Sequence, residues 1–597
     1  MEKEQPEMKS FRRPILLLIS LLSLPALLLH GGGQRDSGDI QKTVSVEDGE
    51  INSAIRETEG IPASPDFWSD LPDDILADEL VNRMSDEELL AQILMFGWAG
   101  REPSPLVTDW VSRRSLGSVK VFGWNTDNIT DVANSVRFLQ EKAQQNRFRI
   151  PLFVATDQEG GWIRHVKGTT TDTPGNLAIG ASGLPSDAYY SGYYIARELR
   201  VLGINMNFAP TVDLYTDPES TVIGPRSFGE DPDAAGILGA SFAAGTMAAG
   251  VLPTAKHFPG HGDTGIDSHG GLPVIEIDEQ TLNARELVPF RYLIKEKLPA
   301  IMSGHISFPN ITEKGEPASL SAYFLRNILR EQMGFEGLII TDDMMMNGAT
   351  TYTGSFSSAV AFAIQAGNDI IISSTTPGLN DAVWRSNISL MQNDESFRTA
   401  VVNAARRVIY YKLVYLKREN APPLFPDPAD IAGRIPAPGG DAFFLEQACR
   451  SITLFREGEL PVGEEEKVLL AGQFSDFFRY GRKRFPLAEM VRLSYQPRQG
   501  EADYAVRTIT ERARSCDTII FCVTNRESLA ILNRLRNLNK KVIVISVLSP
   551  VFILNLEWPD TIIAAYSYSP FSFQAAFGAI AGDFYPQGIF PLAGGLK

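Results

Sequence analysis

Two kinds of residue are in short supply in this chain of 597 residues, and each shortage excludes a class of protein. The three cysteines, Cys449, Cys516 and Cys522, lie in the last quarter, and their spacing offers neither a disulfide framework nor a zinc site. Lysine and arginine number 55 against 72 aspartates and glutamates, which leaves a formal net charge of −17. Such an acidic balance argues against nucleic acid and against an anionic membrane surface as partners.

The remaining composition is that of a soluble globular protein, with 44% hydrophobic and 21% charged residues. The length is sufficient for two or three domains, each with a full core. No internal repeat or low-complexity tract changes this interpretation.

The N-terminus has the pattern of a secretory signal. Lys9, Arg12 and Arg13 precede an apolar stretch over residues 14–29, followed by three glycines. No cysteine follows, which excludes a lipoprotein anchor, and no clear cleavage site is present, so an uncleaved anchor stays open. We expect residues 1–33 to be a signal peptide or N-terminal membrane anchor. The protein would then be exported, to be periplasmic, anchored in the inner membrane or extracellular, with any membrane association through this segment only.

Histidine is scarce too, yet three of the six histidines fall within residues 256–269. They stand there beside Lys256, Asp263 and Asp267, in a segment rich in glycine that follows a short apolar run at 251–255. A strand that leads into a glycine-rich loop crowded with titratable groups is typical of an active site on a rigid scaffold. The alternative is an ordinary solvated polar loop.

Two chemistries are compatible with this cluster. A helical zinc motif would place His257 and His261 one turn apart, but Pro259 and Gly260 between them disfavour any helix. We therefore expect no metal and no other cofactor. Acid/base chemistry needs an aspartate that can hydrogen-bond one ring nitrogen of a histidine, and Asp267-Ser268-His269 offers that pair.

Short β-like runs alternate with helical stretches through most of the chain, which indicates a parallel α/β fold. A capping box of Ser85 and Glu88 predicts a helix that continues through Met95. Polar residues follow several of the predicted strands directly, as they do at the catalytic rim of a barrel. The predicted strands are 118–122, 152–156, 204–208, 251–256, 300–303, 338–341 and 369–373, with helices at 188–201 and 234–249, and the residues at strand ends are Asp157, Asn207, Lys256, His257, His305 and Asp342.

The chain divides near a proline-rich segment. Six prolines between Pro422 and Pro438, closed by two glycines, predict a linker at 421–440. Strand-like runs at 467–471, 518–523, 542–547 and 561–566 predict a smaller α/β sandwich domain over 441–597. Residues 34–65 are predicted to form a flexible tether, and 66–420 the first domain.

Several motifs together resemble glycoside hydrolase family 3, in its bacterial β-N-acetylglucosaminidase (β-N-acetylhexosaminidase) branch. The resemblance spans about residues 76–591 and implies a TIM (β/α)8 barrel followed by the smaller domain. The motifs are Thr156-Asp157-Gln158-Glu159-Gly160-Gly161, Asn207-Phe208-Ala209-Pro210-Thr211-Val212-Asp213, Ile223-Gly224-Pro225-Arg226-Ser227-Phe228, Lys256-His257-Phe258-Pro259-Gly260-His261-Gly262-Asp263, Asp267-Ser268-His269, Met302-Ser303-Gly304-His305-Ile306 and Thr341-Asp342-Asp343.

The resemblance implies roles for seven residues. Asp342 would be the catalytic nucleophile, and His269, with Asp267 as its partner, would be the acid/base. The substrate-binding residues for the sugar hydroxyls would be Asp157, Arg226, Lys256 and His257. The neighbouring Asp343 is the alternative nucleophile, and one aspartate of the pair could instead cap a helix.

Some positions depart from the pattern or stay open. The family usually has an arginine where this chain has His165, with Arg164 one place early. Trp162 is compatible with stacking on a sugar or with packing. We expect His261 and His305 to be structural hydrogen-bonding residues.

These observations predict a retaining exo-β-N-acetylglucosaminidase that acts on terminal N-acetylhexosamine of cell-wall or chitin-type saccharides. The partner would be a carbohydrate, an N-acetylglucosaminide. A β-N-acetylglucosaminide phosphorylase is the first alternative, because a neutral histidine would not repel phosphate. A non-catalytic glycan-binding protein is the second.

Overall fold

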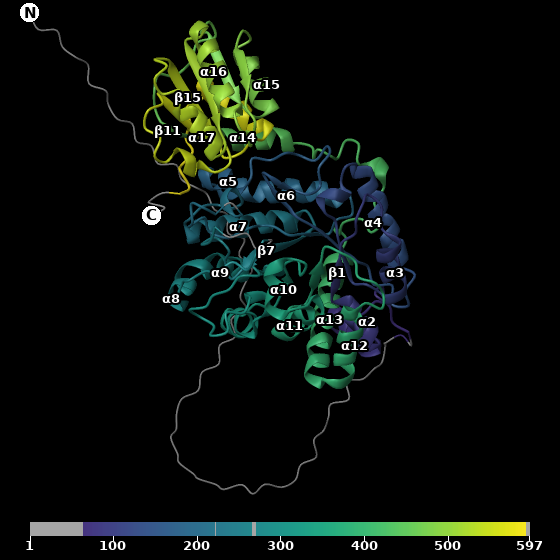
Figure 1. The fold of residues 1–597 in the computed structure, drawn as a ribbon. Helices are drawn as coiled ribbons and strands as arrows, with labels where there is room; N and C mark the ends of the chain where they lie inside the picture. The colour runs from purple at the N-terminus through teal and green to yellow at the C-terminus, as the bar shows by residue number, and fades with distance from the viewer. Residues whose placement is uncertain (1–61, 63, 221, 266–269, 593–597) are drawn as a thin grey trace, which may run out of the picture. The chain divides into compact units, whose positions relative to one another are not determined.

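A computed structural model of the chain describes residue 62 and residues 64–220, 222–265 and 270–592 (Figure 1). The predicted signal or anchor at 1–33 lies outside the described residues, as do most of the predicted tether and the predicted acid/base pair, Asp267 and His269. Of the helices in the described part of the chain, none is both long enough and apolar enough to cross a membrane.

Eight parallel strands form the first domain, and this confirms the predicted barrel. They pair in the order β10-β1-β2-β3-β6-β7-β8-β9, and a parallel bridge between Ile340 and Ile370 joins the last strand to the first. The strands are buried, and their apolar side chains belong to one continuous core. The strands are β1 Leu94–Phe96, β2 Ser118–Lys120, β3 Phe153–Thr156, β6 Met206–Asn207, β7 Leu252–Phe258, β8 Ala300–Ser303, β9 Leu338–Thr341 and β10 Ile371–Ser373.

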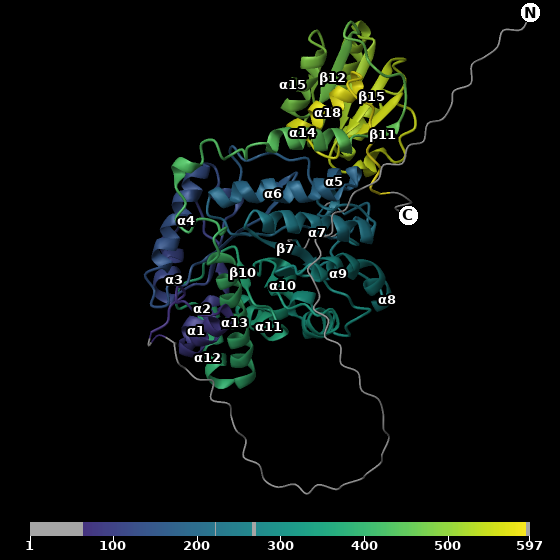
Figure 2. The same cartoon turned by 180° about the vertical axis from the view of Figure 1, so that it is seen from behind.

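Helices cover the outside of the barrel, and α6 and α7 lie side by side in opposite views (Figures 1 and 2). Glycine allows this close packing, because a Cβ at Gly192 would lie 2.2 Å from the Phe242 carbonyl oxygen. The helices are α1 Asp73–Arg83, α2 Asp86–Gln92, α3 Pro105–Arg114, α4 Ile129–Ala143, α5 Asn176–Ser182, α6 Pro185–Val201, α7 Pro232–Ala248, α8 Glu279–Thr281, α9 Leu287–Lys295, α10 Asn347–Thr353, α11 Phe356–Ala366, α12 Ala382–Asn393 and α13 Glu395–Leu416, with π-helical turns at Leu282–Glu286 and Tyr323–Gln332.

The start of the barrel differs from the prediction. The Ser85 hydroxyl accepts a hydrogen bond from the backbone N–H of Glu88, and the Glu88 carboxylate accepts one from the backbone N–H of Ser85. The predicted capping box is therefore confirmed. However, helix α2 ends at Gln92, and Leu94–Phe96 form β1 between β10 and β2. The predicted helix was too long because a short apolar run has the same composition in a buried helix and a buried strand. Pairing with two distant strands decides the outcome.

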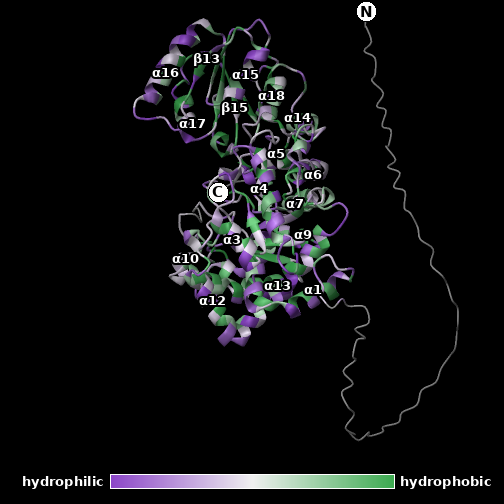
Figure 3. Ribbon diagram, turned by 90° about the vertical axis from the view of Figure 1, so that its right-hand side faces the viewer, coloured by the Kyte–Doolittle hydropathy of each residue, from purple (hydrophilic) through white to green (hydrophobic). Residues whose placement is uncertain are grey.

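A second sheet of six strands follows, in the order β11-β16-β15-β14-β12-β13. Only β11 is antiparallel to its neighbour. Helices α14, α15 and α18 pack on one face and α16 and α17 on the other, and Figure 3 shows apolar colour on the strands and polar residues on α16. The elements are β11 Thr453–Arg456, β12 Val468–Gly472, β13 Glu489–Arg492, β14 Thr518–Val523, β15 Lys541–Ser546, β16 Thr561–Ala564, α14 Gly440–Ser451, α15 Ser475–Arg484, α16 Glu501–Arg512, α17 Arg526–Asn533 and α18 Pro570–Ile580.

The prediction missed the two edge strands, β11 and β13. Both include charged, exposed residues such as Arg456 and Arg492, so neither has the apolar run that marks the central strands. Between the two sheets, α13 ends at Leu416 and α14 begins at Gly440. The exact domain boundaries, 66–420, 421–440 and 441–597, remain a prediction.

Candidate active site

Five of the seven predicted site residues line a single cavity of about 420 Å³. They are Asp157, Arg226, Lys256, His257 and Asp342. Four of them stand at the carboxyl ends of strands: Asp157 follows β3, Lys256 and His257 are near the end of β7, and Asp342 follows β9. Arg226 ends a short 3₁₀ turn, Gly224–Arg226, after β6. The cavity therefore opens on the face where such barrels carry their chemistry.

Asp157 is held by two lysines. Its Oδ1 lies 2.6 Å from Lys256 Nζ and its Oδ2 lies 2.9 Å from Lys120 Nζ. Burial raises the pKa of a carboxyl, but the two ammonium groups outweigh it and hold the pKa of Asp157 well below its usual value. Asp157 therefore stays charged and can accept hydrogen bonds.

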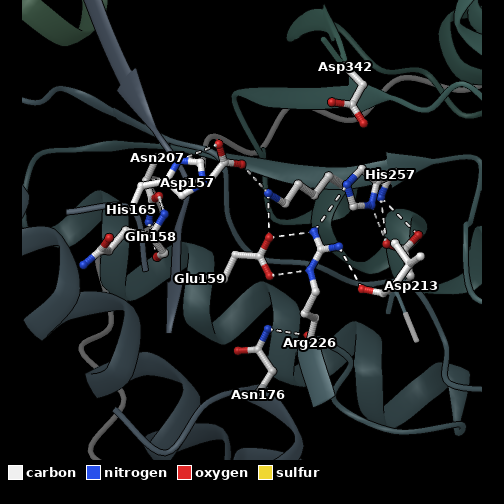
Figure 4. A network of polar contacts seen from close by, with 12 residues as sticks. Asp157, Gln158, Glu159, His165, Asn176, Asn207, Asp213, Arg226, His257 and Asp342 are labelled. Carbon is white, nitrogen blue, oxygen red and sulfur yellow. Dashed lines mark hydrogen bonds and ion pairs between the residues drawn. The ribbon is translucent and has the colours of Figure 1, made fainter. Parts of the chain in front are cut away.

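Glu159, which also lines the cavity, binds Arg226 and Lys256. Figure 4 shows the Glu159–Arg226 pair. The carboxylate meets Arg226 Nη2 at 2.8 Å and Nε at 2.9 Å, and Lys256 Nζ at 2.7 Å. Burial opposes ionisation, yet the two cations bring the pKa of Glu159 down to about 2. Burial also disfavours the charged form of Lys256, but Asp157 and Glu159 together raise its pKa. These four side chains form one fully ionised network.

His257 is oriented by Asp213. Its Nδ1 lies 2.6 Å from Asp213 Oδ2, and its backbone N–H donates to the same carboxylate. The backbone N–H of His261 donates to Asp213 Oδ1 at 2.7 Å. Burial would raise the pKa of Asp213, but His257 lowers it. With Nδ1 engaged, His257 Nε2 lies 3.5 Å from Arg226 Nη2, on the side that lines the cavity.

The two adjacent aspartates after β9 have different surroundings. Asp343 Oδ1 accepts from the backbone N–H groups of Met345 and Ser374, at 3.0 and 2.9 Å. Asp342 Oδ1 accepts from the N–H of Asp343, at 2.7 Å. Figure 4 places the Asp342 carboxylate across the drawn cluster from Glu159 and Arg226. Both aspartates line the cavity, but the Asp343 carboxylate is bound to the backbone of the turn. The capping alternative is wrong for the helix that follows, because the N-cap of α10 is Met346, with no side-chain cap bond.

The charge of Asp342 follows from its neighbours. Burial raises the pKa of a carboxyl, but His257 and Lys120 favour the anion, and the result is a pKa of about 2. Asp342 is therefore a carboxylate at any pH at which the protein would work. A permanently ionised carboxylate is the state that a nucleophile needs.

His261 and His305 are buried. His305 Nδ1 contacts Ser319 Oγ at 2.7 Å, and its Nε2 lies 3.1 Å from the Asp343 carbonyl oxygen. Burial lowers the pKa of His305, and that of His261 to about 4. Within the described ranges, no group of three or more His, Cys, Asp or Glu is arranged to hold a metal ion.

His165 stands where the family usually has an arginine, and its side chain lies at the cavity. Its Nδ1 lies 3.5 Å from Asp157 Oδ2, and burial lowers the pKa of His165 to about 4. Arg164 instead donates to the Thr170 carbonyl oxygen at 2.6 Å. Trp162 lines a different cavity of about 210 Å³.

Three charged residues of the site are absent from the sequence-based prediction of site residues: Lys120, Glu159 and Asp213. Glu159 and Asp213 lie inside the quoted motifs, two residues after Asp157 and at the end of the Asn207–Asp213 stretch, so motif membership was the available signal. Lys120 had a weaker signal, a charged residue between Val119 and Val121 in the predicted strand 118–122.

Comparison with known proteins agrees with this geometry. The family model described as the glycosyl hydrolase family 3 N terminal domain matches residues 86–410. The chain belongs to glycosyl hydrolase family 3. The predicted family is thereby confirmed, and the match covers the whole of the barrel sheet and the cavity-lining residues.

Three family relatives illustrate the extent of similarity. Beta-hexosaminidase A of Pseudoalteromonas piscicida is 36% identical over 283 residues, which cover 45% of this chain and 47% of that protein, about half its length. A beta-hexosaminidase of Methylococcus capsulatus is 32% identical over 53% of this chain and 90% of its own. A solved family 3 beta-N-acetylglucosaminidase from Paenibacillus sp. str. FPU-7 is 26% identical, with a TM-score of 0.76 over 85% of this chain and 99% of that one.

Proposed function

We propose that this family 3 protein is a retaining exo-β-N-acetylglucosaminidase. One observation carries the proposal: an ionised carboxylate, Asp342, faces the same cavity as the charged network of Asp157, Lys256 and Arg226. A retaining glycosidase needs a carboxylate nucleophile placed against a firmly held sugar. Charged hydrogen-bonding groups provide such holding with defined direction.

The substrate class comes from the relatives and from one motif. The relatives above carry the names beta-hexosaminidase and beta-N-acetylglucosaminidase, and Asp267-Ser268-His269 matches the triplet of that branch. The buried floor of Asp157, Glu159 and Lys256 closes one end of the cavity, which suits the end of a saccharide chain. The substrate would be a terminal β-N-acetylhexosamine of a cell-wall or chitin-type saccharide.

In the first step, Asp342 attacks the anomeric carbon. The bond from that carbon to the leaving oxygen breaks, and His269, in its protonated form, transfers a proton to this oxygen. The product is a covalent ester between Asp342 and the sugar. Asp267 would stabilise the imidazolium form of His269 before the transfer.

In the second step, the now neutral His269 takes a proton from water. The hydroxide attacks the anomeric carbon, the ester bond to Asp342 breaks, and the sugar leaves with its original configuration. His269 regains its proton, so the cycle closes with no net change in the protein.

Turnover of p-nitrophenyl N-acetyl-β-glucosaminide, with and without phosphate, tests the proposal. We expect release of N-acetylglucosamine at a rate independent of phosphate. Formation of a sugar 1-phosphate would identify a phosphorylase. Binding without turnover would identify a glycan-binding protein, and Asp342→Asn provides the inactive control.

We also propose that residues 1–33 direct export. The support is Lys9, Arg12 and Arg13 before the apolar stretch 14–29. Fractionation of cells that express the full chain, and the chain that begins at residue 34, tests this. We expect activity outside the cytoplasm only for the full chain.

A further inference from the structure

Trp124 stands out among the residues that line the active-site cavity. Its side chain is 50% exposed, whereas every other lining residue is buried or half-buried. Asp157, Glu159 and Lys256 at the floor are 8%, 1% and 2% exposed. Trp124 therefore lies at the mouth of the cavity, and the charged network lies at its closed end.

Two contacts with neighbouring residues hold the Trp124 indole in place. Its ring stacks on Phe122, with centroids 4.4 Å apart and planes within 5° of parallel. Its Nε1–H donates to the Trp98 carbonyl oxygen at 2.8 Å. One face of the indole is thus covered by Phe122 and its polar atom is satisfied, so the exposed surface of Trp124 is a rigid apolar plane.

Phe122 lies between the Trp124 indole and the charged residues at the closed end of the cavity. The Lys120 ammonium lies 4.4 Å from the centre of the Phe122 ring, and the same ammonium binds Asp157 at 2.9 Å. The cation–π contact and the ion pair restrict both rings relative to the charged network. A ligand bound at the floor therefore meets Trp124 at a constant position and needs no ordering of the indole.

We propose that Trp124 is a binding platform for a second pyranose ring, on the leaving-group side of the bond that breaks. The inference rests on the proposed exo function. If the terminal sugar occupies the charged closed end, whatever projects from the mouth is the leaving group. An ordered indole plane matches the apolar C–H face of a pyranose, and the hydroxyl groups at the ring edge stay in water.

The test compares two substrates that differ only in the leaving group. N-acetyl-β-glucosaminyl fluoride loses a single atom, whereas N,N′-diacetylchitobiose loses a second sugar. For Trp124→Ala we expect the ratio of kcat/KM for chitobiose to kcat/KM for the fluoride to fall about fivefold to tenfold, the range of one aromatic contact. Trp124→Phe, which keeps an aromatic face, should recover part of the ratio.

Trp162→Ala is the matched control, because Trp162 is 39% exposed but lines a different cavity. We expect it to keep the wild-type ratio. An equal loss on both substrates in Trp124→Ala, or a changed ratio only in Trp162→Ala, would overturn the platform. Absence of turnover of either substrate by the wild-type protein would instead refute the proposed function.

A binding measurement separates the platform from a fold defect. In the Asp342→Asn background, titration with chitobiose and with free N-acetylglucosamine should show that Trp124→Ala weakens only chitobiose binding, by the same fivefold to tenfold. Equal weakening of both ligands would contradict the proposal.

Discussion

Glu159 and Arg226 form a two-point ion pair at the floor of the cavity, with Oε1–Nη2 and Oε2–Nε distances of 2.8 and 2.9 Å. The side chains are 1% and 11% exposed. Lys256 binds the same carboxylate at 2.7 Å. Because Glu159 is enclosed by two cations, its own carboxylate is not available to react, and its function is to hold Arg226 and Lys256 in position.

Glu159→Gln should therefore reduce both stability and activity. The amide keeps the shape but leaves Arg226 without its bidentate counter-ion and Lys256 with Asp157 alone. Losing one partner of a buried pair costs about 3–5 kcal/mol. We expect a lower thermal midpoint and a kcat/KM at least about a hundredfold lower, since misplaced positioning groups have effects of that order.

Glu219→Gln is the control for this prediction. Glu219 pairs with Arg526, but their side chains are 63% and 68% exposed, and exposed pairs contribute about 0–1 kcal/mol. We expect a thermal midpoint close to that of the wild type. Equal effects of the two substitutions would show that burial is not what makes the Glu159 pair important.

Asp342→Asn should abolish hydrolysis, and Asp343→Asn should not. The asparagine at 343 keeps an oxygen for the N–H groups of Met345 and Ser374, whereas the asparagine at 342 cannot form the glycosyl ester. An activated 2-fluoro sugar should label the wild-type protein, and peptide mass spectrometry should place the label on Asp342. A label on Asp343 would reverse the assignment.

His269 and Asp267 should matter more for poor leaving groups than for good ones. A dinitrophenolate departs with little protonation, whereas a sugar alkoxide needs the proton. We expect His269→Ala to lose far more activity on chitobiose than on the dinitrophenyl glycoside, and Asp267→Asn to show the same pattern more weakly. Equal losses on the two substrates would remove His269 from the acid role.

Glu286 should make the stability of the protein depend on pH. It is 2% exposed, at the end of the turn that precedes α9, and burial raises its pKa to about 7 despite Arg285 Nε at 2.6 Å. A native carboxyl with a raised pKa binds its proton more tightly than the unfolded chain does. Stability therefore falls as the pH rises from about 4.5 to about 7, by about 3 kcal/mol.

Glu286→Gln removes this titration, and its stability relative to the wild type should increase with pH. The thermal midpoints of both proteins at pH 5 and pH 8 measure the effect. His165 and His261, whose pKa values burial lowers to about 4, act in the opposite direction but equally in both proteins. Glu296→Gln, an exposed position in the same region, should show no such trend. A constant difference between Glu286→Gln and the wild type would contradict the prediction.

The sequence by itself determined those elements whose forming residues lie close together in the chain. The capping box at Ser85 and Glu88 marks a helix start because both partners lie within one turn. The alternation of short apolar runs with helices identifies a parallel α/β fold, because each parallel strand needs a long return connection. The family resemblance narrowed this fold to a barrel. Asp157, Asp342 and the Lys256-His257 pair could be predicted to share one rim because each follows a predicted strand or ends one.

Tertiary structure decided what depends on partners far apart in the chain. Whether Leu94–Phe96 continue a helix or form a strand depends on pairing with β10. The hydrogen bond that holds the Asp343 carboxylate comes from the backbone N–H of Ser374, on a separate segment. Lys120 binds Asp157, and Glu159 binds Arg226, only because the closed barrel brings separate parts of the chain together. Hydrogen bonds and charge pairs act over a few ångströms, so the sequence names the residues while their distances, and the pKa values that follow from them, exist only in the folded chain.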